Sequence, residues 1–157
     1  NEGIPVSGRV IATVLRADGR IEEQVVEKNL VMNNGMDYLA VFQSTAPFSV
    51  MAHMLVGTIT TAATLTDVVG SFGEVARVTM ATRTVPNSNN VLFEVATFAG
   101  NTNGITSVSI RELGRINDAR SGPFGLMAAR VVLGTGVVLA ASDFLSVTWQ
   151  TTTGSRA

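Results

Sequence analysis

The sequence contains no cysteine, one histidine and one lysine among its 157 residues. Without cysteine, the chain has no disulfide bridge, no thiolate zinc site and no cysteine nucleophile. A single histidine, His53, also excludes metal sites built from several histidines. Charged residues make up only 15% of the chain and hydrophobic residues 46%. We therefore expect a packed protein that holds no metal and no cofactor.

Surplus charge of either sign is missing too. Eleven basic residues stand against twelve acidic ones, for a net charge of −1. Proteins that bind the phosphates of nucleic acid need a basic surplus, so no nucleic-acid partner is expected. No apolar stretch reaches the roughly 20 residues needed to cross a bilayer. Residues 1–5 also lack the basic and apolar segments of a signal peptide, and we expect no membrane partner.

What the sequence has in abundance is short segments of alternating apolar and polar residues, the pattern of half-buried strands. An Asp18-Gly19 pair, which favours a tight hairpin turn, separates the first two segments. Eight strands are predicted, at residues 9–16, 20–27, 51–57, 74–85, 91–99, 105–113, 126–133 and 143–152. Gly134-Thr135-Gly136 is expected to be a turn between the last two.

One segment follows a helical period instead. Met36, Leu39 and Ala40 fall on one stripe of a helix, and Asn34 is a favourable N-cap for it. The pattern predicts a single short helix at about residues 35–43.

Many short strands separated by turn residues are typical of an antiparallel sandwich or barrel. The strand–helix–strand alternation of a parallel sheet is absent. We predict one all-β domain over residues 1–157, an antiparallel β-sandwich of jelly-roll type with about eight strands. A short N-terminal arm (1–7) and a C-terminal tail (153–157) would flank it.

The candidates for chemistry are few. As a general base, His53 would need a carboxylate or a nucleophile brought near it by the fold. A small β-sandwich enzyme thus predicts His53 beside a Glu or Asp in a cleft, whereas the alternative is a packed or interfacial histidine. The carboxylates show no calcium-loop spacing, and no two glutamates stand out as a glycosidase pair. We expect no enzymatic activity and no catalytic residue.

Ten of the eleven basic residues are arginine. Arginine is enriched at protein interfaces and lysine is depleted, so this composition favours an oligomer or a protein bound to a larger assembly. Glu74 and Arg77 stand three residues apart, so on a regular strand they point to opposite faces and should not pair. An ion pair between subunits and a solvated strand edge are the alternatives for these two residues, and likewise for Arg111 and Glu112.

A set of short motifs follows a recognisable order along the chain. They are Lys28-Asn29-Leu30-Val31 with Asn34-Gly35, Val56-Gly57-Thr58, Glu74-x-x-Arg77, Glu112-x-Gly114, Met127-x-Ala129-Arg130 and Asp143-x-Leu145-x-Val147-x-Trp149. In this order, over about residues 8–152, the chain resembles virion structural proteins of tailed bacteriophages. It is most similar to capsid decoration or cement proteins, and tail-fibre modules look similar.

The resemblance implies a non-enzymatic protein on the capsid surface of the virion, with the major capsid protein and copies of itself as partners. Such a protein decorates and cements the shell by bridging neighbouring subunits, and many weak copies together gain avidity. The alternative is a tail or fibre component that binds host carbohydrate. That alternative predicts a low copy number and an exposed groove lined by aromatic or carboxylate side chains.

The segments most free to reach a neighbour are residues 1–7, 58–73, 115–125 and 153–157, unless they are simply termini and loops. The candidate assembly contacts are Asn1, Ile4, Pro5, Val6, Arg77, Arg111, Arg115 and Arg120.

Overall fold

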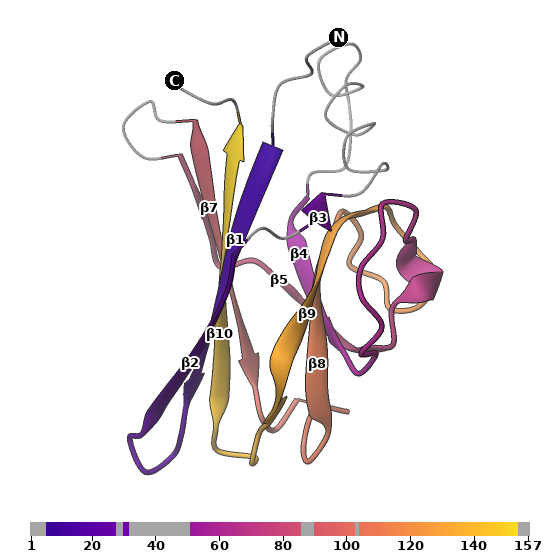
Figure 1. Cartoon of the computed structure of the whole chain (residues 1–157). Coiled ribbons are helices and arrows are strands. Elements are labelled where there is room, and N and C mark those ends of the chain that lie inside the picture. Colours follow the sequence, from indigo (N-terminus) through magenta and orange to yellow (C-terminus); the bar gives the residue numbers. More distant parts are fainter. Residues whose placement is uncertain (1–5, 28–29, 32–50, 86–89, 103, 154–157) are drawn as a thin grey trace, which may run out of the picture.

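Residues 6–27, 30–31, 51–85, 90–102 and 104–153 are described by the computed structural model of the chain. They form ten strands and one 3₁₀ helix (Figure 1). The elements are β1 (Val6–Leu15), β2 (Ile21–Glu27), β3 (Leu30–Val31), β4 (His53–Gly57), η1 (Val69–Ser71), β5 (Glu74–Thr79), β6 (Thr82–Thr84), β7 (Val91–Ala99), β8 (Ser109–Ile116), β9 (Met127–Val138) and β10 (Phe144–Thr153).

The strands are arranged in two antiparallel sheets, which form the two layers in Figure 1. Sheet A has the order β2-β1-β10-β7-β6, and sheet B has the order β3-β9-β8-β4-β5. The predicted all-β antiparallel sandwich is confirmed, with ten strands instead of eight, whereas the jelly-roll type stays a prediction. The helix predicted at 35–43 lies outside the described residues.

The first hairpin has the predicted turn. The backbone N–H of Arg20 donates to the Asp18 carboxylate at 3.0 Å, and Gly19 has a φ of +86°, which a residue with a Cβ rarely adopts. The strands extend further towards the termini than predicted. Val6 in the predicted arm pairs with Thr153 in the predicted tail, as the outermost pair of β1 and β10.

Residues 74–85, predicted as one strand, are divided between the two sheets. The backbone N–H of Met80 donates to Ala52 beside sheet B, and the next N–H, of Ala81, donates to Val95 in sheet A. The prediction of a single strand was wrong because alternation looks the same in either sheet, so the crossing leaves no mark on the pattern.

The turn predicted at Gly134-Thr135-Gly136 was also wrong, because these residues lie within β9. Ile110 pairs with Val137 and Glu112 with Val132, so one residue of β8 faces four residues of β9. A Cβ at Gly136 would lie 2.3 Å from the Ser109 hydroxyl, so this glycine allows the close approach of β8. The glycines therefore mark a bulge in a strand rather than its end.

The core lies between the sheets. Its largest members are Trp149 and Phe98 from sheet A, which pack with Met54, Leu113 and Val131 of sheet B. Full burial of each such aliphatic or phenyl side chain contributes about 1.5–3 kcal/mol to folding.

Candidate functional site

The outer face of sheet B is covered by the loop between β4 and β5, residues 58–73. Its Val69 and Phe72 pack on Leu55, Ile116 and Met127 of the sheet and form a second hydrophobic cluster. Gly114 leaves the room for this, since a Cβ there would lie 3.0 Å from the Phe72 ring and 2.4 Å from Leu55. The loop is thus packed down on a strand surface that would otherwise be exposed.

Arg130, on β9, fastens the same loop through its guanidinium, which is almost fully buried. Its Nε donates to Glu112 at 2.7 Å and its Nη1 to Asp67 at 2.8 Å. Its Nη2 donates to the carbonyl of Thr61 at 2.9 Å. One arginine therefore links the sheet residue Glu112 to two points of the loop.

Glu112 completes the anchorage with its other oxygen. Its Oε1 accepts the backbone N–H of Gly73 at 2.7 Å and that of Ile59 at 3.1 Å, so it holds both ends of the loop. Gly57 makes space for this carboxylate, since a Cβ there would lie 2.5 Å from Oε1. A buried carboxylate with an arginine and two backbone donors is fully satisfied, and loss of Arg130 would leave the charge of Glu112 uncompensated.

Asp67 fixes the middle of the loop. Its carboxylate accepts the Thr64 hydroxyl at 2.6 Å and the Thr64 backbone N–H at 3.0 Å, in addition to Arg130. Burial acts to raise the pKa of Asp67, but these hydrogen bonds outweigh it, and its pKa lies below the ordinary value. The carboxylate is therefore ionised at neutral pH.

A second loop, residues 117–126 between β8 and β9, is fastened by Arg77 in a similar way. The Arg77 side chain is only 1% exposed. It donates to the carbonyls of Asp118 at 2.8 Å, Phe124 at 3.1 Å and Gly122 at 3.2 Å. Its Nε and Nη2 also bind the carboxylate of Glu74 at 3.1 and 2.8 Å.

The Glu74–Arg77 ion pair corrects the expectation that these residues do not pair. Val56 pairs with Ala76 across β4 and β5, but Gly57 pairs with Glu74, so Val75 is an extra, bulged residue. The bulge shifts Glu74 to the strand face that carries Arg77. Spacing alone gave the wrong result because it assumed a regular strand.

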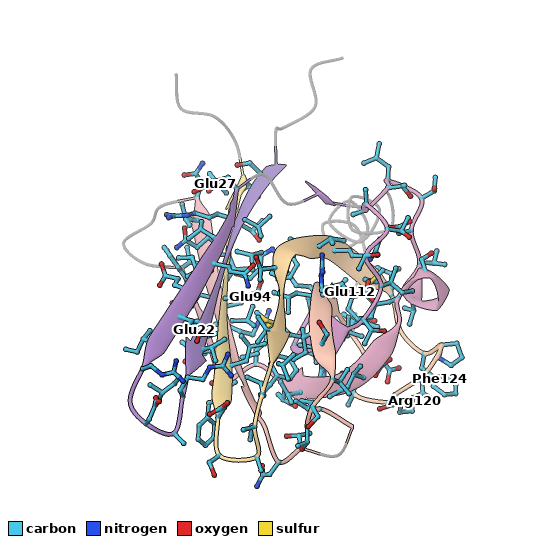
Figure 2. All side chains as sticks on the ribbon, turned by 60° about the horizontal axis from the view of Figure 1, so that its bottom comes forward. Glu22, Glu27, Glu94, Glu112, Arg120 and Phe124 are labelled. Carbon is cyan, nitrogen blue, oxygen red and sulfur yellow. The ribbon has the colours of Figure 1, made fainter. Side chains whose placement is uncertain are left out.

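The outer surfaces of the two loops differ in chemistry. Loop 58–73 exposes Leu65 and Val68 among several threonines. Loop 117–126 exposes Arg120, whose guanidinium carbon lies 4.4 Å from the centre of the Phe124 ring and which pairs with Asp118 at 2.8 Å. Figure 2 shows Arg120 and Phe124 together at the margin of the molecule. Each loop thus presents a small apolar surface on a fixed backbone.

Arg115, predicted as an assembly contact, faces the interior instead. It pairs with the buried Glu94 of β7 across the two sheets, and its guanidinium carbon lies 5.9 Å from the Trp149 ring centre. Burial raises the pKa of Glu94, although Arg115 and Arg83 act against that rise. Figure 2 shows Glu94 between the layers, as expected for a residue that links the sheets.

His53 lies on β4, opposite Thr79 and Ile116. Burial and, to a smaller extent, the charge of Arg77 lower its pKa, while Asp118 acts in the opposite direction. Its Nδ1 is buried without a hydrogen-bond partner in the part of the chain that the structure describes. In that same part, no cluster of three His, Asp or Glu side chains is placed to hold a metal ion. None of the described helices is long and apolar enough to span a membrane.

The other predicted contact residues are scattered. Asn1, Ile4 and Pro5 lie outside the described residues, and Val6 begins β1. Arg111 is half-buried, and its Nη2 donates to the carbonyl of Leu133 at 3.4 Å. Of the four predicted arginines, only Arg120 is exposed, at 67% of its side chain.

Sequence reasoning assigned no role to Asp67, Glu94 or Arg130, and it expected Glu112 in an ion pair between subunits or at a solvated strand edge, whereas Glu112 is buried and pairs with Arg130 of the same chain. Glu112 and Arg130 both belong to the ordered motifs, and this was the one feature of the sequence that pointed to them. No protein-family model, no curated protein and no solved structure matches this chain.

Proposed function

We propose that this chain is a non-enzymatic structural protein of a bacteriophage virion, which decorates the capsid surface and cements it by bridging neighbouring shell subunits. Its partners are the major capsid protein and further copies of itself. The mechanism is binding, because loops held on a rigid scaffold present surfaces that a neighbouring subunit can contact.

The observation that carries the proposal is the anchorage of loop 58–73. Arg130, Glu112 and Asp67 hold it at both ends and in the middle, while Leu65 and Val68 face outwards. A loop fixed before binding loses little conformational entropy on contact with a partner, which favours affinity. Its uncharged outer surface suits an interface core, where charged residues are depleted.

The motif residues support the same interpretation. Glu74 and Arg77 fasten one loop, Gly57, Glu112 and Arg130 fasten the other, and Leu145, Val147 and Trp149 belong to the core. Each of these motif positions thus serves the architecture and the display of loops.

The decisive experiment is the number of copies of this chain per purified particle, measured by quantitative mass spectrometry against the major shell protein. We expect a ratio close to that of the shell subunit. A ratio of a small fraction would overturn the decoration role and favour the tail, and absence from the particle would reject the virion assignment.

A variant pair tests the loop. Leu65→Asp places a charge on the outer surface of loop 58–73 and should reduce the copies bound per particle, since a desolvated charge opposes binding. Val85→Asp is the matched control, because Val85 is also an exposed aliphatic residue but follows β6 of sheet A. Equal occupancy by both variants would exclude the loop as the shell contact.

One feature favours the alternative of a tail or fibre component that binds carbohydrate. A hollow of about 310 Å³ at the β1–β2 turn is lined by the carboxylates of Asp18, Glu22 and Asp143, together with Arg16 and Arg20. Carboxylates and arginines can bind sugar hydroxyls. These groups already pair with one another, however, as in Arg16–Asp143 at 2.9 Å and Arg20–Asp18 at 2.7 Å. Binding to a glycan array, abolished by Glu22→Gln, would support this alternative.

A further inference from the structure

The two sheets differ in how their outer faces are covered. Sheet B lies beneath the two fastened loops, whereas the outward side chains of sheet A include several exposed apolar residues. Residues directly opposite each other on neighbouring strands share a face. The strand register therefore shows which side chains lie together on this face.

An apolar row crosses the face at one end. Ile21 pairs with Leu15, Leu15 with Phe144, and Phe144 with Ala99, from β2 to β7. Ile21, Leu15 and Phe144 are 67%, 46% and 43% exposed. Three large apolar side chains in one exposed row are unusual for a surface that faces only water.

The rest of the face is nearly free of charge. The outward residues on the inner strands are mainly threonine, serine and valine, as in the row of Thr13, Ser146 and Thr97. Among the described strand residues of sheet A, the charged outward ones are Arg9 and Glu27, which pair with each other at 3.0 Å, and Glu23, which accepts the Thr13 hydroxyl at 3.5 Å. A strongly charged partner would therefore meet few opposite charges on this face. The same face of a second copy is also nearly neutral, so the two faces match in charge.

The size of the face also suits a stable contact. Sheet A contains roughly 40 strand residues, each covering about 3.4 Å by 4.8 Å, or about 650 Å² per copy. Two copies would bury about 1,300 Å², within the range of about 1,200–2,000 Å² found for specific interfaces.

We propose that a second copy of this chain docks face to face on the outer surface of sheet A, with the row Ile21–Leu15–Phe144 at one end of the contact. The central strand of the sheet is β10. A two-fold axis parallel to β10 would bring Phe144 against Phe144 of the second copy and Leu15 against Ala99 of the second copy. Small residues at Ser146 and Thr148 would let the sheets approach to about 10 Å, the usual spacing of stacked sheets.

This inference rests on the self-association in the proposed function, but its test needs only the purified chain. Sedimentation over a range of concentrations should show a dimer for the wild type. Leu15→Glu and Phe144→Glu should weaken dimerisation by a factor of about ten or more, because each copy would bury an unpaired carboxylate. Leu65→Glu is the matched control, since Leu65 is equally exposed but lies on loop 58–73.

A monomeric wild type would overturn the inference, and so would a dimer unaffected by either sheet A variant or weakened equally by Leu65→Glu. Circular dichroism melts establish that the variants remain folded. Failure here would leave the virion assignment to be decided by copy number in particles, so the two failures are distinguishable.

The absence of cysteine from the sequence allows a second test. Ser146→Cys places a single thiol near the proposed axis, and a short bis-maleimide cross-linker, which can span the roughly 10 Å between stacked sheets, should link two copies. Thr66→Cys on loop 58–73 is the control and should stay unlinked. Linkage through Thr66→Cys but not through Ser146→Cys would contradict the proposed face.

Discussion

Arg130 and Glu112 form a buried ion pair of 2.7 Å beneath loop 58–73, and each of them also binds the loop directly. The pair thus connects β8 and β9 to a segment that covers their outer face. Its removal should affect the loop more than the sandwich core, because the core lies on the other side of sheet B.

Replacement of Arg130 by methionine should lower the free energy of unfolding by about 3–5 kcal/mol, because the carboxylate of Glu112 would stay buried without its partner. Hydrogen exchange at the amides of Ile59 and Gly73 should quicken, and chemical denaturation would give the loss of stability. Arg120→Met is the control, since its ion pair is exposed, and should leave stability essentially unchanged. A small effect of Arg130→Met would mean that the loop is held mainly by Phe72.

Gly57→Ala should destabilise the protein by about 1–3 kcal/mol through overpacking. The new Cβ would lie 2.5 Å from Glu112 Oε1 and 2.6 Å from the carbonyl of Gly73, so the carboxylate would have to leave its position. Thermal melts measure the effect. Gly70→Ala, in the adjoining loop 58–73, is the matched control, because no atom lies within 4 Å of a Cβ there, and it should be close to neutral. Equal melting temperatures for both variants would contradict the tight packing at Gly57.

Arg77→Lys should release loop 117–126 although it keeps the positive charge. A lysine ammonium cannot bind Glu74 in a bidentate manner and reach three carbonyls as the guanidinium does. We expect a loss of about 2–3 kcal/mol in the free energy of unfolding and faster proteolysis between Asp118 and Gly125. Arg20→Lys, at an exposed pair with Asp18, should show neither effect. An unchanged proteolysis pattern in Arg77→Lys would show that loop 117–126 does not depend on the hydrogen bonds of the Arg77 guanidinium.

Acid should weaken the fold through Asp143. Hydrogen bonds from the backbone of Ala140, the side chain of Arg16 and the backbone of Ala17 lower the pKa of Asp143 below its ordinary value of 3.8. The ionised carboxylate therefore stabilises the folded state above pH 3.8, and this contribution is lost as the pH falls through the lowered pKa. Unfolding measured between pH 5 and 2 should show less acid dependence in Asp143→Asn than in the wild type.

Glu94 provides the contrast for this experiment. Burial raises the pKa of Glu94 above its ordinary value of 4.5. Because the unfolded chain then ionises more readily at this residue, the free energy of unfolding falls as the pH rises above 4.5. Glu94→Gln should therefore leave the loss of stability below pH 4 in place. If the free energy of unfolding depends on pH in the same way in Asp143→Asn and in the wild type, Asp143 does not cause the loss of stability in acid.

The sequence predicted well those features that depend on neighbouring residues. The β1–β2 hairpin follows from alternation and from Asp18-Gly19, because the turn residues act on their own backbone. The strand at 91–99 was predicted with its observed ends. The candidate site was predicted less well, since Arg77 and Arg115 were expected at the surface and both are buried within the chain.

The sequence by itself determined that the chain folds as an antiparallel β-sandwich, since alternation, turn residues and β-branched side chains act locally. Only the tertiary structure decided which sheet each strand joins, where Val75 bulges and which carboxylates the arginines bind. These features depend on contacts between residues far apart in the chain, such as Asp67 and Arg130. The exposed row Ile21–Leu15–Phe144 likewise exists only once β1, β2 and β10 lie side by side, because cross-strand register places the three side chains on one face.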